Sequence, residues 1–266
     1  VTSKGLYQLF LNGQKVSDEL FTPGWTSYYK RTQYQTFDVT SMLQGKNSLG
    51  AILGDGWYRG TIGWSSKRGY YGTKLALLAQ LQINYTDGTS EMICSDNSWK
   101  VVDNGPIRGS GIYDGETYDA RMEIPGWDKP GFNDSKWESA SVISQSNEIL
   151  TAPQGVPVRA IMEIKPIKLM TTPKGETVYD LGQNMVGWVR LKVQGKKGDK
   201  VVIKFAEVLD KDGNFYTENL RKAKATDTYI LKGDGEEVFE PHFTFHGFRF
   251  VQLEEFPGKP TLDNIT

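Results

Sequence analysis

Short runs of β-branched and aromatic residues, separated by glycine-containing turns, recur along this sequence and restrict it to a few kinds of fold. Three of the turns, with the segments on either side, are Asn12-Gly13 between Tyr7–Leu11 and Lys15-Val16, Asp87-Gly88 between Leu75–Tyr85 and Glu91–Cys94, and Gly233-Asp234-Gly235 between Thr228–Leu231 and Val238-Phe239. Asn-Gly and Asp-Gly favour hairpin turns because both residue types tolerate positive φ. Only Glu218–Ala225 has a helical pattern, and it could equally be a loop. The chain is therefore predicted to be all-β.

The domain organisation follows from length and from one change in composition. The chain has 266 residues, enough for one large β domain or for two of ordinary size. Between Ser144 and Pro157 the apolar periodicity gives way to Ser, Gln, Asn, Pro and Gly. We predict two antiparallel β-sandwiches in tandem, residues 1–150 and 151–266.

The charge balance excludes some classes of partner. The chain has 31 basic and 32 acidic residues, so no long-range field would attract nucleic acid or an anionic membrane. It contains no apolar run near the roughly 20 residues of a membrane span. Aromatic residues make up 12% of the chain, which suits β-sheet faces and also stacking against sugar rings. We expect a neutral partner.

The cysteine content and the N-terminal sequence say less about function. Cys94 is the single cysteine, so the chain has no intrachain disulfide, and we expect this residue to be small, apolar and buried. The chain begins Val1-Thr2-Ser3-Lys4, with neither an initiator Met nor a leader, which suggests a processed piece.

Two sets of segments, in order along the chain, resemble one protein family. The first set comprises Leu53–Gly60, Trp99-Lys100, Gly105–Ile107, Ile112–Arg121 and Pro125–Trp127, and the second comprises Tyr179–Trp188, Ala206–Leu209, Tyr216–Leu220 and His246–Phe250. The first set resembles the N-terminal jelly-roll domain of bacterial α-L-rhamnosidases of glycoside hydrolase family 78, which is related to carbohydrate-binding module family 67. The second resembles the concanavalin-like domain that precedes the catalytic domain in the same enzymes.

This resemblance implies a function for a longer polypeptide. The parent would be an inverting hydrolase that removes terminal α-linked L-rhamnose, with its Glu acid and Glu base on a later (α/α)₆ barrel. The present chain would be an ancillary, catalytically silent part that positions the missing C-terminal catalytic domain and holds rhamnose or rhamnose-containing glycans weakly. Bacterial enzymes of this type are often periplasmic or extracellular. The alternative is a stand-alone, lectin-like carbohydrate-binding protein without hydrolase activity.

A candidate sugar site lies at Asp55-Gly56-Trp57-Tyr58-Arg59. Sugars are bound by such mixtures, because hydroxyls pair with carboxylate or guanidinium groups while C–H faces pack on aromatic rings. We predict that Asp55, Trp57, Tyr58 and Arg59 contact sugar. The two aromatic residues could equally be core anchors at a strand end.

The same resemblance implies a calcium site. Calcium takes oxygen ligands, and the loop Asp103–Pro106 offers carboxylate, carboxamide and backbone oxygens. The rhamnose-binding module is similar, and it implies Asp55, Asn104 and Pro106 as the metal ligands here. That module has an Asn after its Asp, whereas here Gly56 follows Asp55 and supplies no side-chain oxygen.

Asp114 and Glu116 form a second candidate site. Two residues apart on a strand they would share a face at roughly 7 Å, close to the spacing of an inverting carboxylate pair. Asp114-Gly115 is, however, also typical of a turn. Three alternatives stay open, namely a catalytic pair, a polar site in which Glu116 binds sugar or lies near calcium, and structural hydrogen bonding.

Three further groups have mainly structural interpretations. His242 and His246 lie in an alternating segment, where four residues span roughly 13 Å, too far for two imidazoles to share a zinc ion. The basic cluster Lys196–Lys200 is predicted to be a solvated hairpin tip. Glu207, Glu218 and Asn219, near Tyr216, are predicted to support an interface with the catalytic domain or, as a second possibility, to contact substrate.

Overall fold

The computed structural model describes residues 1–64, 67–144 and 147–266, and its two compact units interleave along the sequence. The first unit comprises Val1–Arg59, Tyr71–Asn104 and Ile124–Arg159, and the second comprises Gly60–Tyr70, Gly105–Glu123 and Ala160–Thr266. The second unit therefore takes two segments from the first half of the sequence. A single division at residue 150 would leave both segments with the first unit.

The first unit is built from short strands in several small sheets. Its elements are β1 (Thr2–Lys4), β2 (Leu6–Leu11), β3 (Gln14–Lys15), β4 (Thr32–Gln33), β5 (Leu49–Gly54), α1 (Gly56–Arg59), β8 (Ala76–Leu78), β9 (Gln80–Asn84), β10 (Ser90–Cys94), β11 (Lys100–Val101), β14 (Glu138–Ser139), β15 (Leu150–Thr151) and 3₁₀ helices at Thr40–Met42 and Asn147–Ile149. The sheets are β3-β2-β5, β1-β8, β9-β10, β11-β14 and β15-β4. The last pair is parallel.

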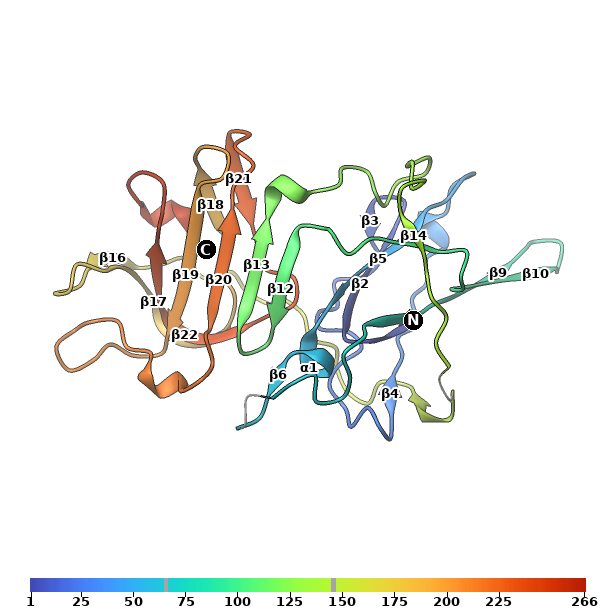
Figure 1. The fold of residues 1–266 in the computed structure, drawn as a ribbon, viewed down its shortest axis with the longest axis horizontal. Helices are drawn as coiled ribbons and strands as arrows, with labels where there is room; N and C mark the ends of the chain where they lie inside the picture. The colour runs from blue at the N-terminus through green and yellow to red at the C-terminus, as the bar shows by residue number, and fades with distance from the viewer. Residues whose placement is uncertain (65–66, 145–146) are drawn as a thin grey trace. The chain divides into compact units, whose positions relative to one another are not determined.

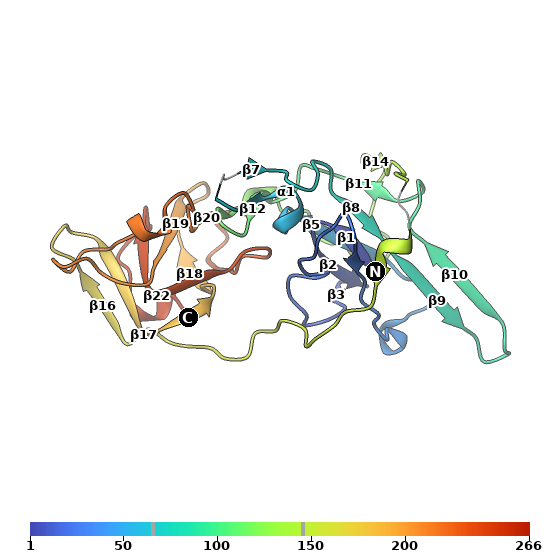
Figure 2. The same ribbon diagram turned by 90° about the horizontal axis from the view of Figure 1, so that it is seen from below.

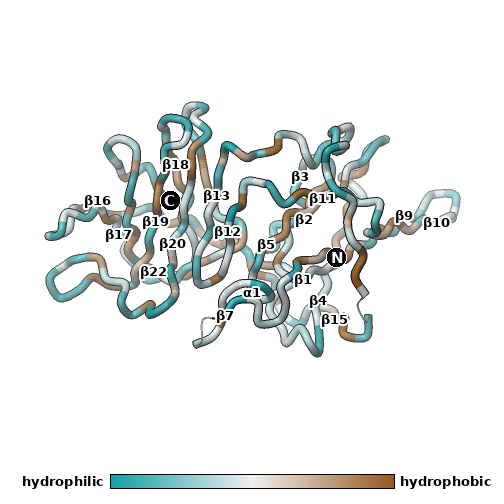
Figure 3. Tube along the Cα trace, in the orientation of Figure 1, coloured by the Kyte–Doolittle hydropathy of each residue, from teal (hydrophilic) through white to brown (hydrophobic). Residues whose placement is uncertain are grey.

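Strand β2 is central to this unit. Asn12 and Gly13 have φ of 55° and 82°, which places the predicted turn between β2 and β3 and confirms the hairpin. On its other side β2 pairs with β5 from Leu6↔Gly54 to Leu11↔Leu49. Leu6, Leu9 and Leu11 are buried, and Figure 3 shows the hydrophobic colouring of β2. The strand carries apolar residues into the core of the first unit.

The predicted turn at Asp87-Gly88 also joins two strands. Strands β9 and β10 pair antiparallel from Asn84↔Ser90 to Gln80↔Cys94 and form a two-stranded ribbon (Figure 2). All five residues of β10 are exposed. The expectation that Cys94 is buried is therefore wrong, because its strand belongs to this exposed ribbon and not to a core layer.

The second unit contains the longer strands. Its elements are β6 (Thr61–Ile62), β7 (Lys67–Arg68), β12 (Ile107–Gly111), β13 (Gly115–Asp119), β16 (Lys168–Thr171), β17 (Thr177–Gly187), β18 (Leu191–Gln194), β19 (Lys200–Ala206), β20 (Thr226–Ile230), β21 (Glu236–Phe239), β22 (His246–Glu254) and 3₁₀ helices at Ala120–Met122, Glu218–Leu220 and Leu262–Asn264. The helical or loop-like segment that begins at Glu218 is thus a short 3₁₀ helix followed by turns.

A seven-stranded sheet with the order β12-β13-β20-β19-β22-β17-β16 organises this unit (Figure 1). The hairpin β12–β13 joins strands that lie far later in the sequence. Strand β13 pairs with β20 in parallel, from Thr117↔Thr228 to Asp119↔Ile230, whereas β12 with β13 and β19 with β20 pair antiparallel. The expected antiparallel sandwich therefore contains one parallel seam here.

The core of the second unit lies between this sheet and the pair β18-β21. Along β19, Val201, Ile203 and Phe205 are buried in the core, while Lys200 and Lys204 lie on the other face. Leu191 and Phe239 face this core from the second layer, where they pair across β18 and β21. The predicted all-β, sandwich-type fold is confirmed.

The segment Lys196–Lys200 differs from its prediction. It connects β18 to β19, which belong to different sheets, so it is not a hairpin tip. The amide of Gly198 donates to the carbonyl of Leu231, and the amide of Leu231 donates to the carbonyl of Asp199, both at 2.9 Å. These hydrogen bonds hold in place the connection that passes from the layer of β18 to the layer of β19.

Arg249 holds the irregular part of the β17–β22 pairing. The register shifts between Asp180 and Met185, and Gly182, with φ 84°, donates its amide to Oδ1 of Asp180 at 2.8 Å. The guanidinium of Arg249 contacts both oxygens of Asp180 at 2.8 Å, as expected from the predicted structural hydrogen bond of this arginine. The hydrogen bond from Arg249 lowers the pKa of Asp180.

Within the described ranges, no helix has the length and apolar character needed to cross a bilayer.

Acid should weaken the Asp180–Arg249 pair. Because the pKa of Asp180 is lower in the folded state than its unfolded value of about 3.9, the stabilisation is complete above that pH and is lost as pH falls through the folded pKa. Asp180→Asn should lower the free energy of unfolding at neutral pH and should flatten its fall in acid. Urea unfolding at a series of pH values measures both effects, with Asp212→Asn, whose side chain is 63% exposed, as the control. Equal acid dependence in Asp180→Asn and the wild type would contradict this account.

Candidate functional site

The predicted sugar site lies where β5 ends and α1 begins, within the first unit. Asp55 is only 2% exposed, and its Oδ1 accepts from Nε of Arg59 at 2.5 Å. The backbone amide of Arg59 donates to the carbonyl of Asp55 at 3.1 Å, so the same short turn holds both ends of the pair. The side chain of Arg59 is 37% exposed. A ligand would therefore meet the guanidinium before the carboxylate.

Packing explains the glycine after Asp55. Gly56 has φ 50°, and a β carbon at this position would lie 2.5 Å from Cγ of the buried Leu6. Any side chain at position 56 must displace a core leucine. The Asn of the related module therefore does not fit this backbone without a shift.

The aromatic residues divide between core and surface. Tyr58 is buried, and its ring meets Tyr28 edge-on with centroids 5.4 Å apart, so its core-anchor interpretation is favoured. Burial raises the pKa of Tyr58, which keeps the hydroxyl protonated. Trp57 is half-buried and stacks on Trp25, with ring centroids 5.8 Å apart and planes 4° apart.

Trp25 is the residue that sequence reasoning missed. It is 53% exposed and extends the indole surface of Trp57 toward solvent. Its sequence signal is a tryptophan directly after the turn-forming Pro23-Gly24, where a core residue is not expected. We call the stacked pair of Trp25 and Trp57 the tryptophan platform.

The predicted calcium ligands fit a metal only in part. Asp55 contributes one carboxylate, of which Oδ1 is bound to Arg59, and Asn104 is exposed in the same unit. Pro106 belongs to the second unit, where its carbonyl accepts from the amide of Asp119 at 2.8 Å. Calcium prefers roughly six to eight oxygens, so most ligands would have to be water. Among the described residues no group of three or more His, Cys, Asp or Glu side chains could hold a metal ion.

Glu116 is fully buried in the second unit, which differs from the predicted contact with sugar. Its carboxylate accepts from the amides of His242 and Phe243 at 3.0 Å and contacts Nδ1 of His242 at 2.8 Å. Its own amide donates to Oδ1 of Asp227 at 2.8 Å. These contacts favour structural hydrogen bonding among the three alternatives.

Asp114 lies apart from this buried network. It occupies the turn between β12 and β13, and its Oδ2 accepts from the hydroxyl of Thr61 at 3.0 Å. Asp114 and Glu116 therefore do not share a strand face as a catalytic pair would. Of the two histidines, His242 contacts Glu116 and His246 contacts Asp227, so each pairs with its own carboxylate, as a structural role predicts.

The predicted interface residues gather on one exposed surface of the second unit. Nδ2 of Asn219 donates to Oε2 of Glu207 at 3.3 Å, and Glu218 lies beside Asn219 in an exposed 3₁₀ turn. In the same loop, the guanidinium of Arg221 lies 4.4 Å from the centroid of the exposed Trp64 ring. This surface combines polar groups with a cation–π pair.

Comparison with known protein families shows to which family this chain belongs. The model of the α-L-rhamnosidase N-terminal domain matches residues 1–162, and that of the bacterial α-L-rhamnosidase concanavalin-like domain matches residues 170–266. The chain belongs to the α-L-rhamnosidase family. Both resemblances expected from the sequence, and their order, are thereby confirmed.

Known α-L-rhamnosidases are much longer than this chain. An α-L-rhamnosidase of Streptomyces avermitilis is 50% identical over 100% of this chain and 26% of its own length, and one of Formosa agariphila is 40% identical over 98% and 28%. A crystal structure of the Streptomyces avermitilis enzyme complexed with L-rhamnose gives a TM-score of 0.93, with 48% identity over 99% of this chain and 26% of that one. A structure of the Aspergillus terreus enzyme gives 0.95, with 42% identity over 99% and 31%. The chain thus spans about a quarter to a third of these relatives.

Loss of the Glu116 charge should destabilise the chain strongly. Glu116→Gln places an amide group among backbone N–H donors, and we expect the free energy of unfolding to fall by about 3 kcal/mol. Thermal and urea unfolding measure the loss. Glu236→Gln, on the exposed part of β21, should change stability by less than about 0.5 kcal/mol. If both variants were equally stable, the buried carboxylate would not be an anchor.

Restoring the related module's asparagine at position 56 should cost stability. Asn tolerates positive φ, so the loss in Gly56→Asn, about 1–3 kcal/mol, would come from overpacking against Leu6. Gly88→Asn is the matched control, because Gly88 has φ 86° and a β carbon there would meet nothing within 4 Å. Chemical denaturation of both variants tests the packing account. Equal losses in the two would place the cause in the backbone conformation.

Proposed function

We propose that this chain is the ancillary, non-catalytic part of an α-L-rhamnosidase, and that the whole polypeptide hydrolyses terminal α-L-rhamnosides. The observation that carries this proposal is the ordered pair of rhamnosidase domain matches in a chain that covers only 26–28% of related enzymes. The reaction would invert the anomeric configuration, with a Glu acid and a Glu base on a separate catalytic domain. Cellular export to the periplasm or the medium is part of the same proposal.

Weak binding of L-rhamnose by the first unit is the second part of the proposal. The tryptophan platform supports it, because stacked indoles offer an apolar surface for the C–H face of a sugar. Arg59, two residues after Trp57 in α1, has a partly exposed guanidinium that can donate to sugar hydroxyls. Calcium, held in the first unit by Asp55 and Asn104 with added water, would strengthen the site by binding hydroxyl oxygens.

The exposed surface of the second unit suits a supporting role toward the catalytic domain. Glu207 and Asn219 are already joined by a hydrogen bond, so they present a fixed polar pair to a partner. A tethered sugar site needs only weak affinity, because the linkage keeps its ligand at high local concentration near the barrel. The ancillary role therefore requires no chemistry in this chain.

Titration with L-rhamnose tests the binding part. Tryptophan fluorescence should change saturably at millimolar sugar, because Trp25 is 53% exposed at the proposed contact, and an excess of chelator should weaken the response if calcium takes part. Trp25→Ala should lose most of the response, whereas Trp64→Ala, which changes an exposed tryptophan of the second unit, should keep it. The absence of any change at tens of millimolar rhamnose, with the protein folded, would contradict binding. Turnover of an aryl α-L-rhamnoside by this chain would contradict the non-catalytic role.

A further inference from the structure

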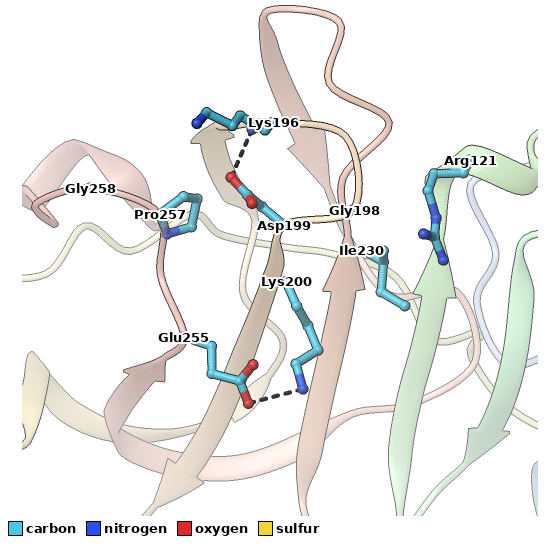
Figure 4. A pocket seen from close by; sticks show the side chains of 9 residues that line it. All are labelled: Arg121, Lys196, Gly198, Asp199, Lys200, Ile230, Glu255, Pro257 and Gly258. Carbon is cyan, nitrogen blue, oxygen red and sulfur yellow. Dashed lines mark hydrogen bonds and ion pairs between the residues drawn. The ribbon is translucent and has the colours of Figure 1, made fainter.

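The second unit contains an open groove that the proposed rhamnose site does not use. It has a volume of about 680 Å³ and lies where β19 begins and where β20 and β22 end (Figure 4). Its lining includes five charged residues, Arg121, Lys196, Asp199, Lys200 and Glu255. Ile230 and Pro257 supply the apolar part, and Gly198 and Gly258 complete the rim. All of these residues belong to the second unit.

Four charged side chains of this groove have a partner within the protein, namely Arg121, Asp199, Lys200 and Glu255. Nζ of Lys200 lies 2.9 Å from Oε1 of Glu255. Nε and Nη2 of Arg121 contact the two oxygens of Asp119 at 2.8 and 2.7 Å, and Oδ2 of Asp199 accepts from the amide of Lys196 at 2.7 Å. Figure 4 shows the ammonium of Lys196 directed away from the other lining side chains. An inorganic anion or cation would therefore have to compete with an existing ion pair or hydrogen bond.

Each paired group keeps a second atom for hydrogen bonding. Arg121 retains Nη1 as a donor, Glu255 retains Oε2 as an acceptor and Asp199 retains Oδ1. A hydroxyl group both donates and accepts, so neighbouring hydroxyls on a sugar ring can meet a donor and an acceptor together. Figure 4 shows Ile230 between Lys200 and Arg121, where it can contact the C–H face of a ring. This combination fits a neutral polyhydroxylated ligand better than an ion.

The backbone at Glu255 is a second, independent observation. Glu255 has φ 55°, a conformation in which glycine is unstrained and glutamate is not. The ion pair with Lys200 offsets little of that strain, because the two side chains are 40% and 56% exposed and surface pairs contribute little to stability. The strained position nevertheless puts a carboxylate on the groove wall. Strain of this kind is often found at binding sites.

We propose that this groove is a second carbohydrate site, which binds one or two units of a neutral saccharide. Sugar hydroxyls would bridge Nη1 of Arg121 to the free oxygens of Glu255 and Asp199, while a C–H face packs on Ile230 and Pro257. The proposed binding needs no calcium, since protein donors and acceptors meet the hydroxyls directly. The proposal does not rest on the rhamnose site of the first unit.

Nuclear magnetic resonance titration of the ¹⁵N-labelled chain tests the site directly. The probes are methyl α-L-rhamnopyranoside and methyl β-D-galactopyranoside, with sodium sulfate as the anion. At least one glycoside should shift the amide signals of Gly198 and Gly258 saturably at millimolar concentration and in the presence of chelator, while sulfate should not. Shifts at Gly56 would report the first unit separately. No shift at Gly198 and Gly258 with either glycoside at tens of millimolar, or a larger shift with sulfate, would overturn the proposal.

A glycine substitution separates binding from folding. Glu255→Gly removes the carboxylate and relieves the positive φ, so thermal stability should be kept or raised while affinity falls about tenfold. Arg121→Ala should weaken binding by a similar factor. Lys211→Ala removes an exposed ion-pairing lysine outside the groove, with a side chain 89% exposed, and should bind as the wild type does. Wild-type affinity in Glu255→Gly would overturn the assignment of the carboxylate, and with it the site.

Discussion

The second unit depends on two buried carboxylates that join segments distant in sequence. Glu116 on β13 accepts two backbone amides and contacts the ring of His242, while Asp227 on β20 accepts the amide of Glu116 and contacts His246. Both carboxylates are fully buried, so their desolvation is tolerable only because each oxygen has a partner. Phe205 stacks on His246 at 3.9 Å and closes one side of this network. These buried contacts therefore stabilise the parallel pairing of β13 with β20.

Close packing at the start of β13 reinforces this seam. A β carbon on Gly115, which has φ 96°, would lie 2.0 Å from the carbonyl oxygen of Thr226, so only glycine lets the hairpin approach β20. Once the hairpin is seated, Asp119 and Arg121 at its far end meet the end of β20, where the groove lies. The placement of the hairpin beside β20 thus forms both the buried carboxylate contacts and one wall of the groove.

Local signals in the sequence predicted local structure well and long-range pairing poorly. The turn at Asn12-Gly13 could be predicted because its two residues determine its conformation. The insertion of β12–β13 beside β20 could not, because the bond between Glu116 and Asp227 joins residues 111 positions apart and leaves no periodic signal. Asp114-Gly115 indicated the turn, but no local signal shows which layer covers Glu116. Trp25 was missed for the same reason, because its role follows from stacking on Trp57.

Several acidic residues of this chain are held in contacts within the fold. A hydrolytic site of the inverting kind needs two carboxylates that face a common space holding sugar and water. Here Glu116 and Asp227 are buried by the fold, Asp55 and Asp180 are paired with arginine, and Glu255 is paired with lysine. Carboxylates fixed in this way are good hydrogen-bond acceptors and poor proton shuttles, since protonation would break the contacts that hold them. This use of the acidic residues supports the proposal that the chain holds and positions a glycan and that hydrolysis takes place in a separate domain.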